Sequence, residues 1–324
     1  MSLRIPDLVT VALVAMPLAA QSGESAPYPS KPIRLIVPTV PGSPPDVVGR
    51  MVGERLSGAL RQSVVVDNRP GAIGTIGLHA VTRATPDGYT IGVISMPYVI
   101  APSLLAQVPY DTVRDLAPVT LVNWSYTLLA VPARSPARAL TDLLALAKAQ
   151  PGALKFSSNG NGTPSHVMAE LFQREAGVRM IHIPYKGSMA GVNAVLAGDV
   201  DMTIGAAVSV APHVKAGKLR ALATAAPKRL STVPDVPTLL ELGYPKLHVS
   251  DWQGIVAPAA TPAKVIYRLH GEIERTLRSV DTQQRLETLG MEAAGAGPKE
   301  FAAHIHHEVQ RWSKLVRDAG IKAE

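Results

Sequence analysis

Cysteine is absent from this sequence of 324 residues. Disulfide bonds, thiolate metal sites, cysteine nucleophiles and a lipid anchor on an N-terminal cysteine are therefore excluded. Aromatic side chains are also scarce, at 4% of the residues, although the net charge is +7. A nucleic-acid-binding surface usually combines clustered Lys and Arg with rings on which bases stack. Because the charges here are scattered and the rings are few, we expect no nucleic-acid partner.

Long apolar runs are also rare, and the clearest one lies at the N-terminus, from Leu8 to Ala20. It follows a single basic residue, Arg4, and ends in small residues, which is typical of a secretory signal peptide. The run is short for a membrane span, which needs about 20 apolar residues; an N-terminal anchor is the alternative. We expect residues 1–20 to be a signal peptide and the protein to be exported to the periplasm.

Strand-like apolar runs alternate with helix-like segments along most of the chain. This alternation predicts an α/β fold with mainly parallel sheets that are covered by helices on both faces. Ten strands are many for one open sheet, so we expect two sheets. The predicted strands are residues 33–37, 63–68, 89–95, 118–122, 127–133, 154–159, 180–185, 200–205, 219–225 and 252–257. The predicted helices are residues 46–61, 74–83, 139–149, 164–176, 188–197, 209–216, 262–289 with a break near Asp281, and 298–318.

Three turns rich in glycine or proline follow predicted strands and lead into predicted helices, at residues 38–46, 69–77 and 157–166. In open α/β sheets, ligands bind beyond the carboxyl ends of the strands, where helix N-termini present N–H groups. The first turn also contains Ser43 and, three residues later, Asp46, which is the pattern of a capping box. Each turn can therefore be a ligand-binding loop or simply a rigid, well-capped connection.

Signatures of catalysis and of cofactor binding are missing. The glycines of the second turn match neither the dinucleotide-binding fingerprint nor a P-loop, and no G-x-S-x-G elbow occurs. The segment 304–308, HIHHE, has the residue types of a metal site but not the spacing of a known zinc motif, so we expect a solvated helix face. We expect no catalytic residue, cofactor or metal. The alternative is a secreted α/β hydrolase-like enzyme that uses Ser165 or Ser188 with His166.

A set of ordered segments gives this chain a family resemblance. They include VVVDNRPGAIGTIG, ATPDGYTIGV, HIPYKGS and WQGIVAPAATP. From about Tyr28 to Ile321 the chain closely resembles the Bug family, the extracytoplasmic solute-binding receptors associated with tripartite tricarboxylate transporters. Each segment alone is a modest signal, whereas the ordered set is highly specific.

The resemblance implies a two-domain periplasmic-binding-protein-like fold of type II with the ligand in a cleft between the domains. Domain 1 would comprise residues 28–122 and 252–324, and domain 2 residues 123–251. The implied function is a periplasmic receptor, a monomer, for a small organic acid. It would deliver this carboxylate ligand to the membrane subunits of a tripartite tricarboxylate-type transporter or to a sensor.

The resemblance also places the binding residues on the three turns and on two further strand ends, where backbone amides and ordered waters would hold a ligand carboxylate. The implied ligand-binding residues are Thr39, Val40, Ser43, Asp46, Ala72, Gly74, Thr75, Ser95, Asn159, Gly162, Thr163, His166, Gly205 and Ala206.

Two departures from the family pattern bear on the ligand. The family usually has an aromatic residue, Ala, Pro, Gly and Gly where this chain has residues 39–43, TVPGS. An aspartate is common in the family where this chain has Gly205. Since that negative charge could pair with a ligand ammonium, its loss favours plain carboxylates or uncharged aromatic acids over amino acids.

Overall fold

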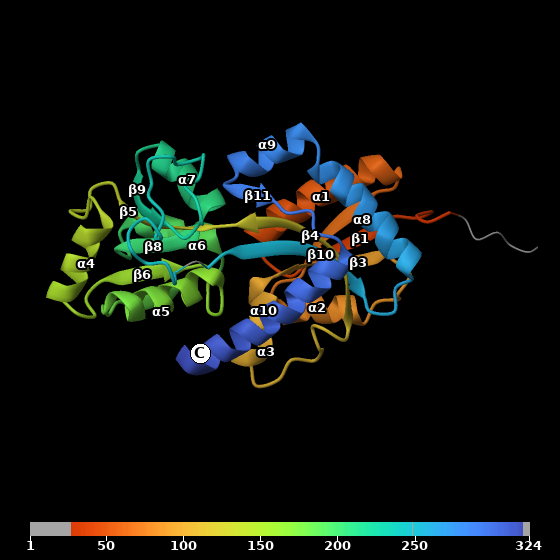
Figure 1. The fold of residues 1–324 in the computed structure, drawn as a ribbon, viewed down its shortest axis with the longest axis horizontal. Helices are drawn as coiled ribbons and strands as arrows, with labels where there is room; N and C mark the ends of the chain where they lie inside the picture. The colour runs from red at the N-terminus through yellow and green to blue at the C-terminus, as the bar shows by residue number, and fades with distance from the viewer. Residues whose placement is uncertain (1–26, 248, 320–324) are drawn as a thin grey trace, which may run out of the picture.

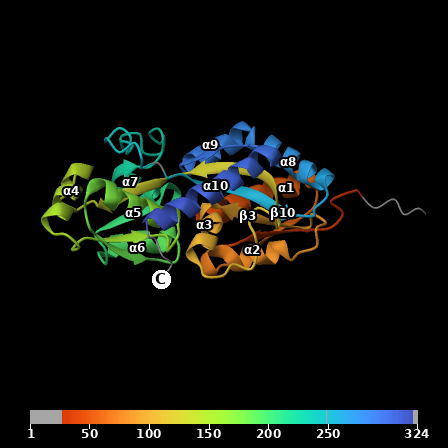
Figure 2. The same ribbon diagram turned by 60° about the horizontal axis from the view of Figure 1, so that its bottom comes forward.

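The computed structural model describes residues 27–247 and 249–319. The molecule consists of two α/β domains that lie side by side along its long axis (Figure 1), an arrangement that Figure 2 shows from a second direction. The predicted signal peptide, residues 1–20, lies outside the described residues. Within the described part of the chain, no helix has both the length and the apolar character needed to cross a membrane.

The first sheet has six strands in the order β11-β4-β10-β3-β1-β2. Its strand β1 presents alternate residues to opposite faces of the sheet, because Leu35 and Val37 pack toward α1 and α8 whereas Ile36 packs toward α2, α3 and α10. Helices therefore cover both faces of this sheet. The elements of the first domain are β1 (Ile33–Val37), α1 (Pro44–Leu60), β2 (Val64–Asn68), η1 (Ala72–Gly74), α2 (Thr75–Thr82), β3 (Thr90–Ser95), α3 (Met96–Leu104), β4 (Leu116–Ser125), β10 (Asp251–Pro258), α8 (Ala263–Leu277), α9 (Val280–Thr288), β11 (Met291–Ala293) and α10 (Pro298–Ala319).

The second sheet has five strands in the order β7-β6-β8-β5-β9. Its strand β5 alternates in the same way, since Leu129 packs toward α4 and α5 and Leu128 packs toward α6 and α7. The elements of the second domain are β5 (Thr127–Pro132), α4 (Leu140–Ala149), β6 (Lys155–Ser158), α5 (Pro164–Ala176), β7 (Ile181–Pro184), α6 (Ser188–Ala197), β8 (Met202–Ala206), α7 (Ala207–Lys215) and β9 (Leu219–Thr224).

The expectation of mainly parallel sheets is wrong, because antiparallel pairs outnumber parallel ones. Strand β1 pairs in parallel with β2 and β3, and β6 with β7 and β8. By contrast, β10 is antiparallel to β3 and β4, β11 to β4, and β5 to β8 and β9. The antiparallel pairs follow from the path of the chain. Strand β4 leads into β5 of the second domain, and the chain returns to the first domain at β10.

Most predicted elements form within a few residues of their expected bounds. All ten predicted strands are present, and the break in the long helical segment lies between α8 and α9, with Ser279 as the N-cap of α9. Helix α3 and strand β11 were not predicted. Helix α3 is hard to recognise because it contains Pro97 and Pro102, although proline is tolerated in a first helical turn.

Candidate functional site: a cleft between the two domains

A cavity of about 500 Å³ lies between the two domains. Its walls are the carboxyl ends of strands and the turns that follow them. Six helices begin at these walls: α1, α2 and α3 of the first domain and α5, α6 and α7 of the second. The N-cap residues of these six helices all line the cavity; they are Ser43, Gly74, Ser95, Thr163, Gly187 and Ala206.

Convergent helix N-termini make this cavity suitable for an anion. The first N–H groups of a helix have no partner within the helix, and the helix dipole places partial positive charge at the same end. A carboxylate at such an end accepts hydrogen bonds and is stabilised by the dipole. We call this cavity the cleft.

The first turn is held in shape by the side chain of Ser43, but not as predicted. Ser43 Oγ donates to the carbonyl oxygen of Val40 at 2.8 Å, and it does not cap an N–H group of α1. The predicted capping box is therefore wrong. The hydroxyl instead closes the turn on itself, so that the backbone of Thr39 and Val40 forms part of the cleft wall.

Asp46 supports the same turn from behind the cleft wall. Its carboxylate accepts from the Gly42 N–H at 2.9 Å, from Asn68 Nδ2 at 2.8 Å and from Arg50 Nε at 3.0 Å. Burial alone would raise the pKa of Asp46, but the hydrogen bonds from Arg50, Gly42 and Asn68 outweigh it and hold the pKa below its ordinary value. Asp46 therefore positions the turn as a buried carboxylate.

The second turn has an unusual backbone. The φ angles of Gly71, Ala72, Ile73 and Gly74 are all positive, from 46° to 127°. Two of these residues are not glycine, and such backbone strain is concentrated at binding sites in proteins. Gly74 is required by packing as well, because a Cβ atom there would overlap the ring of Tyr98. The turn contributes Gly71, Ile73 and Gly74 to the cleft wall.

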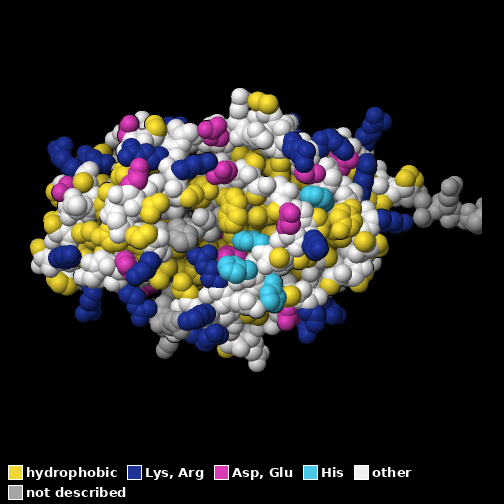
Figure 3. Space-filling model, viewed as in Figure 1, with side chains coloured by type: hydrophobic (Ala, Val, Ile, Leu, Met, Phe, Trp, Pro, Cys, Tyr) yellow, Lys and Arg dark blue, Asp and Glu magenta, His cyan; other side chains and the backbone are white. Residues whose placement is uncertain are grey.

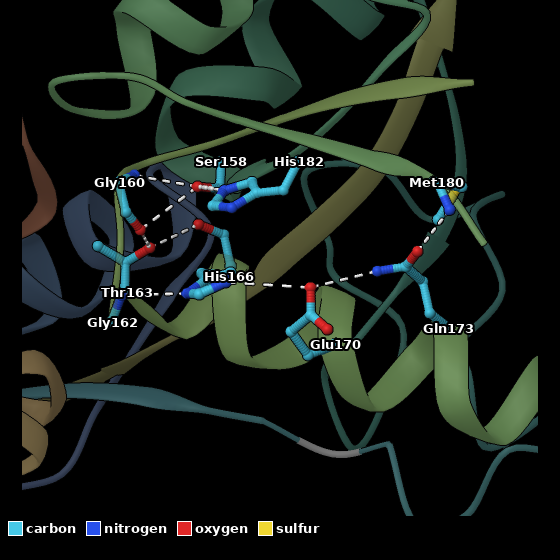
Figure 4. A network of polar contacts seen from close by, with 10 residues as sticks. Ser158, Gly160, Gly162, Thr163, His166, Glu170, Gln173, Met180 and His182 are labelled. Atoms are coloured by element: carbon cyan, nitrogen blue, oxygen red, sulfur yellow. Dashed lines mark hydrogen bonds and ion pairs between the residues drawn. The ribbon is translucent and has the colours of Figure 1, made fainter. Parts of the chain in front are cut away.

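A hydrogen-bonded network fixes the third turn (Figure 4). Thr163 Oγ1 donates to the carbonyl oxygen of Gly160 at 2.6 Å, and Ser165 Oγ accepts from the Asn159 N–H at 2.9 Å. His166 Nδ1 accepts from the Gly162 N–H at 3.1 Å. The side chains of Ser165 and His166 thus lie behind the turn and hold its backbone in place.

A second histidine, His182, completes this network and was not predicted. Its ring stacks on the ring of His166 with centroids 4.3 Å apart, and its Nε2 lies 2.6 Å from Ser158 Oγ. Burial lowers the pKa of His182 to about 4, so this imidazole is neutral at physiological pH. A neutral ring can support the turn without adding charge beside the cleft.

The contacts of the serines give no support to the hydrolase alternative. Ser165 accepts from a backbone N–H, as described, and Ser188 Oγ accepts from the Ala206 N–H at 3.2 Å. Hydrolysis by a serine nucleophile requires a hydrogen bond from the serine to a base, and neither of these contacts is such a bond. Both serines instead stabilise the turns at the starts of α5 and α7.

The cleft contains side chains that the sequence did not single out. Asp251 begins β10 and lines the cleft, and burial raises its pKa to about 7. Thr127 begins β5, and its buried Oγ1 has no hydrogen-bond partner within the described chain. Lys186 lies on the exposed turn before α6. No local motif identifies them, because the cleft places them together only through the folded chain.

Eight of the fourteen predicted ligand-binding residues line the cleft: Thr39, Val40, Ser43, Gly74, Ser95, Asn159, Thr163 and Ala206. The other six are not among the described residues that line the cleft. They lie on or directly beside the same turns and strand ends: Asp46, Ala72, Thr75, Gly162, His166 and Gly205.

The HIHHE segment forms part of α10 and is not a solvated face throughout. His304 packs edge-on against the ring of Trp252, with centroids 4.8 Å apart. Glu308 is 3% exposed and accepts from the indole N–H groups of Trp252 and Trp312 at 3.0 and 2.7 Å. His306 and His307 are exposed as expected. In residues 27–247 and 249–319, no group of three or more potential ligand side chains could hold a metal ion.

His304, His307 and Glu308 of α10 border a second cavity of about 570 Å³ near the crossing between the domains. Figure 3 shows histidine side chains beside a hydrophobic area on this face. No convergence of helix N-termini like that in the cleft occurs here among the described lining residues. The cleft is therefore the better candidate for an anionic ligand.

Comparison with known proteins gives consistent results. A family model described as "Tripartite tricarboxylate transporter family receptor" matches residues 48–321. Protein BugT of Bordetella pertussis is 36% identical over 316 residues, which cover 97% of this chain and 95% of BugT.

Two solved structures are similar over nearly the whole chain. The periplasmic binding protein BugD has a TM-score of 0.85 at 31% identity, covering 92% of this chain and 100% of BugD. R. palustris Rpa4515, solved with adipate, has a TM-score of 0.86 at 31% identity, covering 91% of this chain and 99% of Rpa4515.

Proposed function

Since this chain belongs to the tripartite tricarboxylate transporter family of receptors, we propose that it binds a small organic acid in the cleft between its domains. The predicted resemblance to the Bug family and the predicted two-domain periplasmic-binding-protein-like fold are both confirmed. Members of this family are solute-binding receptors. What is proposed is the ligand class and the place where this chain holds it.

The observation that carries the proposal is the convergence of six helix N-termini on one cavity of about 500 Å³. That volume is within the usual range for small-molecule sites. The similar protein Rpa4515 was solved with adipate, a dicarboxylate, which is the kind of ligand that such helix ends suit. Eight of the residues implied by the family resemblance lie on the walls of this cavity, which supports the proposal further.

The proposed cellular role has three parts. The protein is exported by its N-terminal segment, acts in the periplasm as a monomer, and passes its ligand to the membrane subunits of a transporter or to a sensor. It has no catalytic activity, a proposal that the backbone partners of Ser165 and Ser188 support. The expected division, with residues 28–122 and 252–324 in domain 1 and residues 123–251 in domain 2, is supported by the two crossings that lead into β5 and β10. We place the boundaries slightly differently, because residues 123–125 of β4 and Asp251 of β10 pair within the first sheet and belong with domain 1.

Thermal unfolding with a panel of ligands tests this proposal. The panel holds mono-, di- and tricarboxylates, aromatic acids and amino acids, each with its neutral amide as the matched control. A ligand present at 100 times its Kd stabilises the folded state by about 2.7 kcal/mol, which raises the Tm by several degrees. We expect at least one acid, and not its amide, to do so without being consumed. Stabilisation by no acid, or turnover of a generic ester, would contradict the proposal.

A further inference from the structure

Three hydrogen-bond donors hold the carboxylate of Asp251 in the cleft wall. Asp251 Oδ1 accepts from the N–H groups of Trp252 and Met96, at 2.9 and 3.3 Å. Oδ2 accepts from Gln253 Nε2 at 2.9 Å. Met96 is the first residue of α3, so a carboxylate of the protein itself already occupies this helix N-terminus.

The surroundings of Asp251 are fixed by further buried hydrogen bonds. Asn123 Nδ2 donates to Gln253 Oε1 at 2.7 Å, and Gln253 Nε2 also donates to Ser125 Oγ at 3.2 Å. An ionised carboxylate offers about four acceptor positions. The three donors use three of them, which leaves one for a donor on the ligand, and Asp251 lines the cleft.

The opposite wall of the cleft, from the second domain, has the groups that suit an anion. Helices α6 and α7 have no proline in their first turns, although the N–H group of Ala207, the first residue of α7, donates to the Tyr126 carbonyl oxygen at 2.8 Å. The helix α5 of the same wall begins with Pro164. Lys186 lies just before α6. Thr127, which pairs with Ala206 at the start of α7, has a buried hydroxyl without a partner in the described chain.

The cleft is therefore electrostatically polarised from one domain to the other. Among the described residues that line it, the charged side chains are Lys186 on the second domain and Asp251 on the first. We propose that the ligand is an amino-bearing organic acid that binds in one direction, with its carboxylate against α6, α7, Lys186 and Thr127 and its ammonium group against Asp251. This inference rests on the proposed function, because it requires that a carboxylate binds in the cleft.

The chemistry at Asp251 discriminates between otherwise similar ligands. A ligand ammonium donates to the remaining acceptor position and neutralises a buried negative charge. A second ligand carboxylate at that position cannot donate and is repelled by the like charge in a low-dielectric site. This proposal differs from the expectation, drawn from Gly205, that plain carboxylates are favoured over amino acids.

Matched ligand pairs test the proposal by isothermal titration calorimetry at pH 8. Each pair is an amino acid and its deaminated analogue: aspartate and succinate, glutamate and glutarate, phenylalanine and 3-phenylpropionate, leucine and 4-methylpentanoate. We expect the amino member of the best-binding pair to bind at least about tenfold more tightly, the effect of one charge-assisted hydrogen bond. Asp251→Asn should abolish this preference, whereas Asp235→Asn, on an exposed loop, should keep it.

The outcomes separate the two proposals. Equal or tighter binding of the deaminated member, or a preference that survives Asp251→Asn, overturns the role of Asp251 but leaves the receptor for an organic acid intact. Binding of no acid of either kind overturns the proposed function itself.

A measurement on the native protein covers the case in which Asp251→Asn does not fold. The titratable groups that face Asp251 are Glu308 of α10 and Tyr98 of α3, and burial keeps Tyr98 protonated because it raises the pKa of that phenol. Between pH 6 and 8.5, ionisation of Asp251 should increase the preference for the amino member of the pair. A preference that is constant or falls over this range contradicts the proposal.

Discussion

Thr127 illustrates how a single residue can serve binding at the expense of stability. A buried hydroxyl without a partner costs about 1–3 kcal/mol. Its Oγ1 has no partner in the described chain, while the neighbouring Thr224 Oγ1 donates to the Thr127 carbonyl oxygen at 3.2 Å. The unpaired hydroxyl of Thr127 is explained if a ligand carboxylate accepts from it.

Thr127→Val should therefore separate affinity from stability. Valine keeps the shape of the side chain and removes the unpaired hydroxyl, so we expect the unfolding free energy to stay the same or rise by about 1 kcal/mol. Ligand affinity should fall about tenfold. Urea unfolding and calorimetry measure the two quantities, and Thr224→Val, which removes a paired hydroxyl, should instead lower stability. A loss of stability in Thr127→Val with full affinity would show that this hydroxyl is structural.

The buried carboxyl of Asp251 should make stability depend on pH. Its folded-state pKa, about 7, is above the ordinary value of 3.8 because of burial, so the folded protein keeps a proton that the unfolded chain releases between these values. Its contribution to the unfolding free energy therefore falls as the pH rises from about 4 to 7, by about 4 kcal/mol at most.

Urea unfolding of the native protein and Asp251→Asn at several pH values checks this prediction. The lowered pKa of His182 acts in the opposite direction below pH 6.5 and is the same in both proteins, so their difference isolates Asp251. We expect the native protein to lose stability relative to the variant from pH 4 to 8. A constant difference would mean that the carboxyl titrates normally.

Gly74 tests whether the second turn depends on close packing. A Cβ atom there would overlap the Tyr98 ring, whereas Gly152 has a similar φ, +78° against +81°, and no atom within 4 Å of the added Cβ. Gly152→Ala thus reports only the strain of the left-handed backbone, about 1 kcal/mol. Gly74→Ala should cost about 1–3 kcal/mol more in urea unfolding and should weaken ligand binding. Equal costs would mean that the turn yields easily.

For single residues, the sequence identifies a cleft residue only when the role of that residue depends on its neighbours in the chain. Ser43, Gly74 and Thr163 were identified because turn residues and helix caps have local signals. Asp251 and Thr127 were not, since each is an ordinary polar residue at the start of an apolar strand. Only the antiparallel insertion of β10 and the crossing from β4 into β5 bring them to the cleft.

Among the six helices that begin at the cleft, α2, α6 and α7 have no proline in their first turns, whereas α1, α3 and α5 do. Helix α1 shows that a helix of this fold can begin with two prolines, Pro44 and Pro45. The second position of α6, Met189, has an exposed side chain. Proline at this position would therefore remove one N–H group from the first turn of α6, next to Ser188 of the cleft wall, without removing a core contact.

Met189→Pro should weaken binding of the acid about tenfold, which is the loss of one hydrogen bond to a charged group, and should change the Tm little. Met189→Ala is the matched control, because it shortens the side chain and keeps the N–H group. Calorimetry with the tightest-binding acid measures the effect. Equal affinities of the two variants would show that α6 does not contact the ligand.

Elements with a clear apolar pattern were predicted well, and strand direction was not. The continuous apolar runs of β1 and β5 and the turn signals between elements are properties of the local sequence. Direction and order are set by long-range pairing, as in β10 between β3 and β4, and no local signal encodes this. Helix α3 was missed because its two prolines obscure the helical pattern.

The whole molecule is two domains joined at two crossings and touching across the cleft. An added Cβ at Gly187 of domain 2 would lie 3.1 Å from Val40 Cγ2 of domain 1, so these two walls are in contact. This contact narrows the cleft at one point between the domains. We therefore expect the free protein to populate a more open arrangement in solution.

Small-angle X-ray scattering checks this expectation. Saturation with a binding acid should lower the radius of gyration, because the ligand bridges the helix N-termini of the two domains and favours the closed arrangement. A non-binding amide is the control. An unchanged radius with a bound acid would mean that the walls do not move.

The measurement that tests the central claim most directly is a crystal structure of the protein with the tightest-binding acid of the thermal panel. We expect the ligand in the cleft, with its carboxylate within hydrogen-bond distance of the first N–H groups of α6 or α7 and of Thr127 Oγ1. An empty cleft with the acid bound elsewhere, for example in the cavity beside α10, would contradict the claim that the cleft holds the ligand.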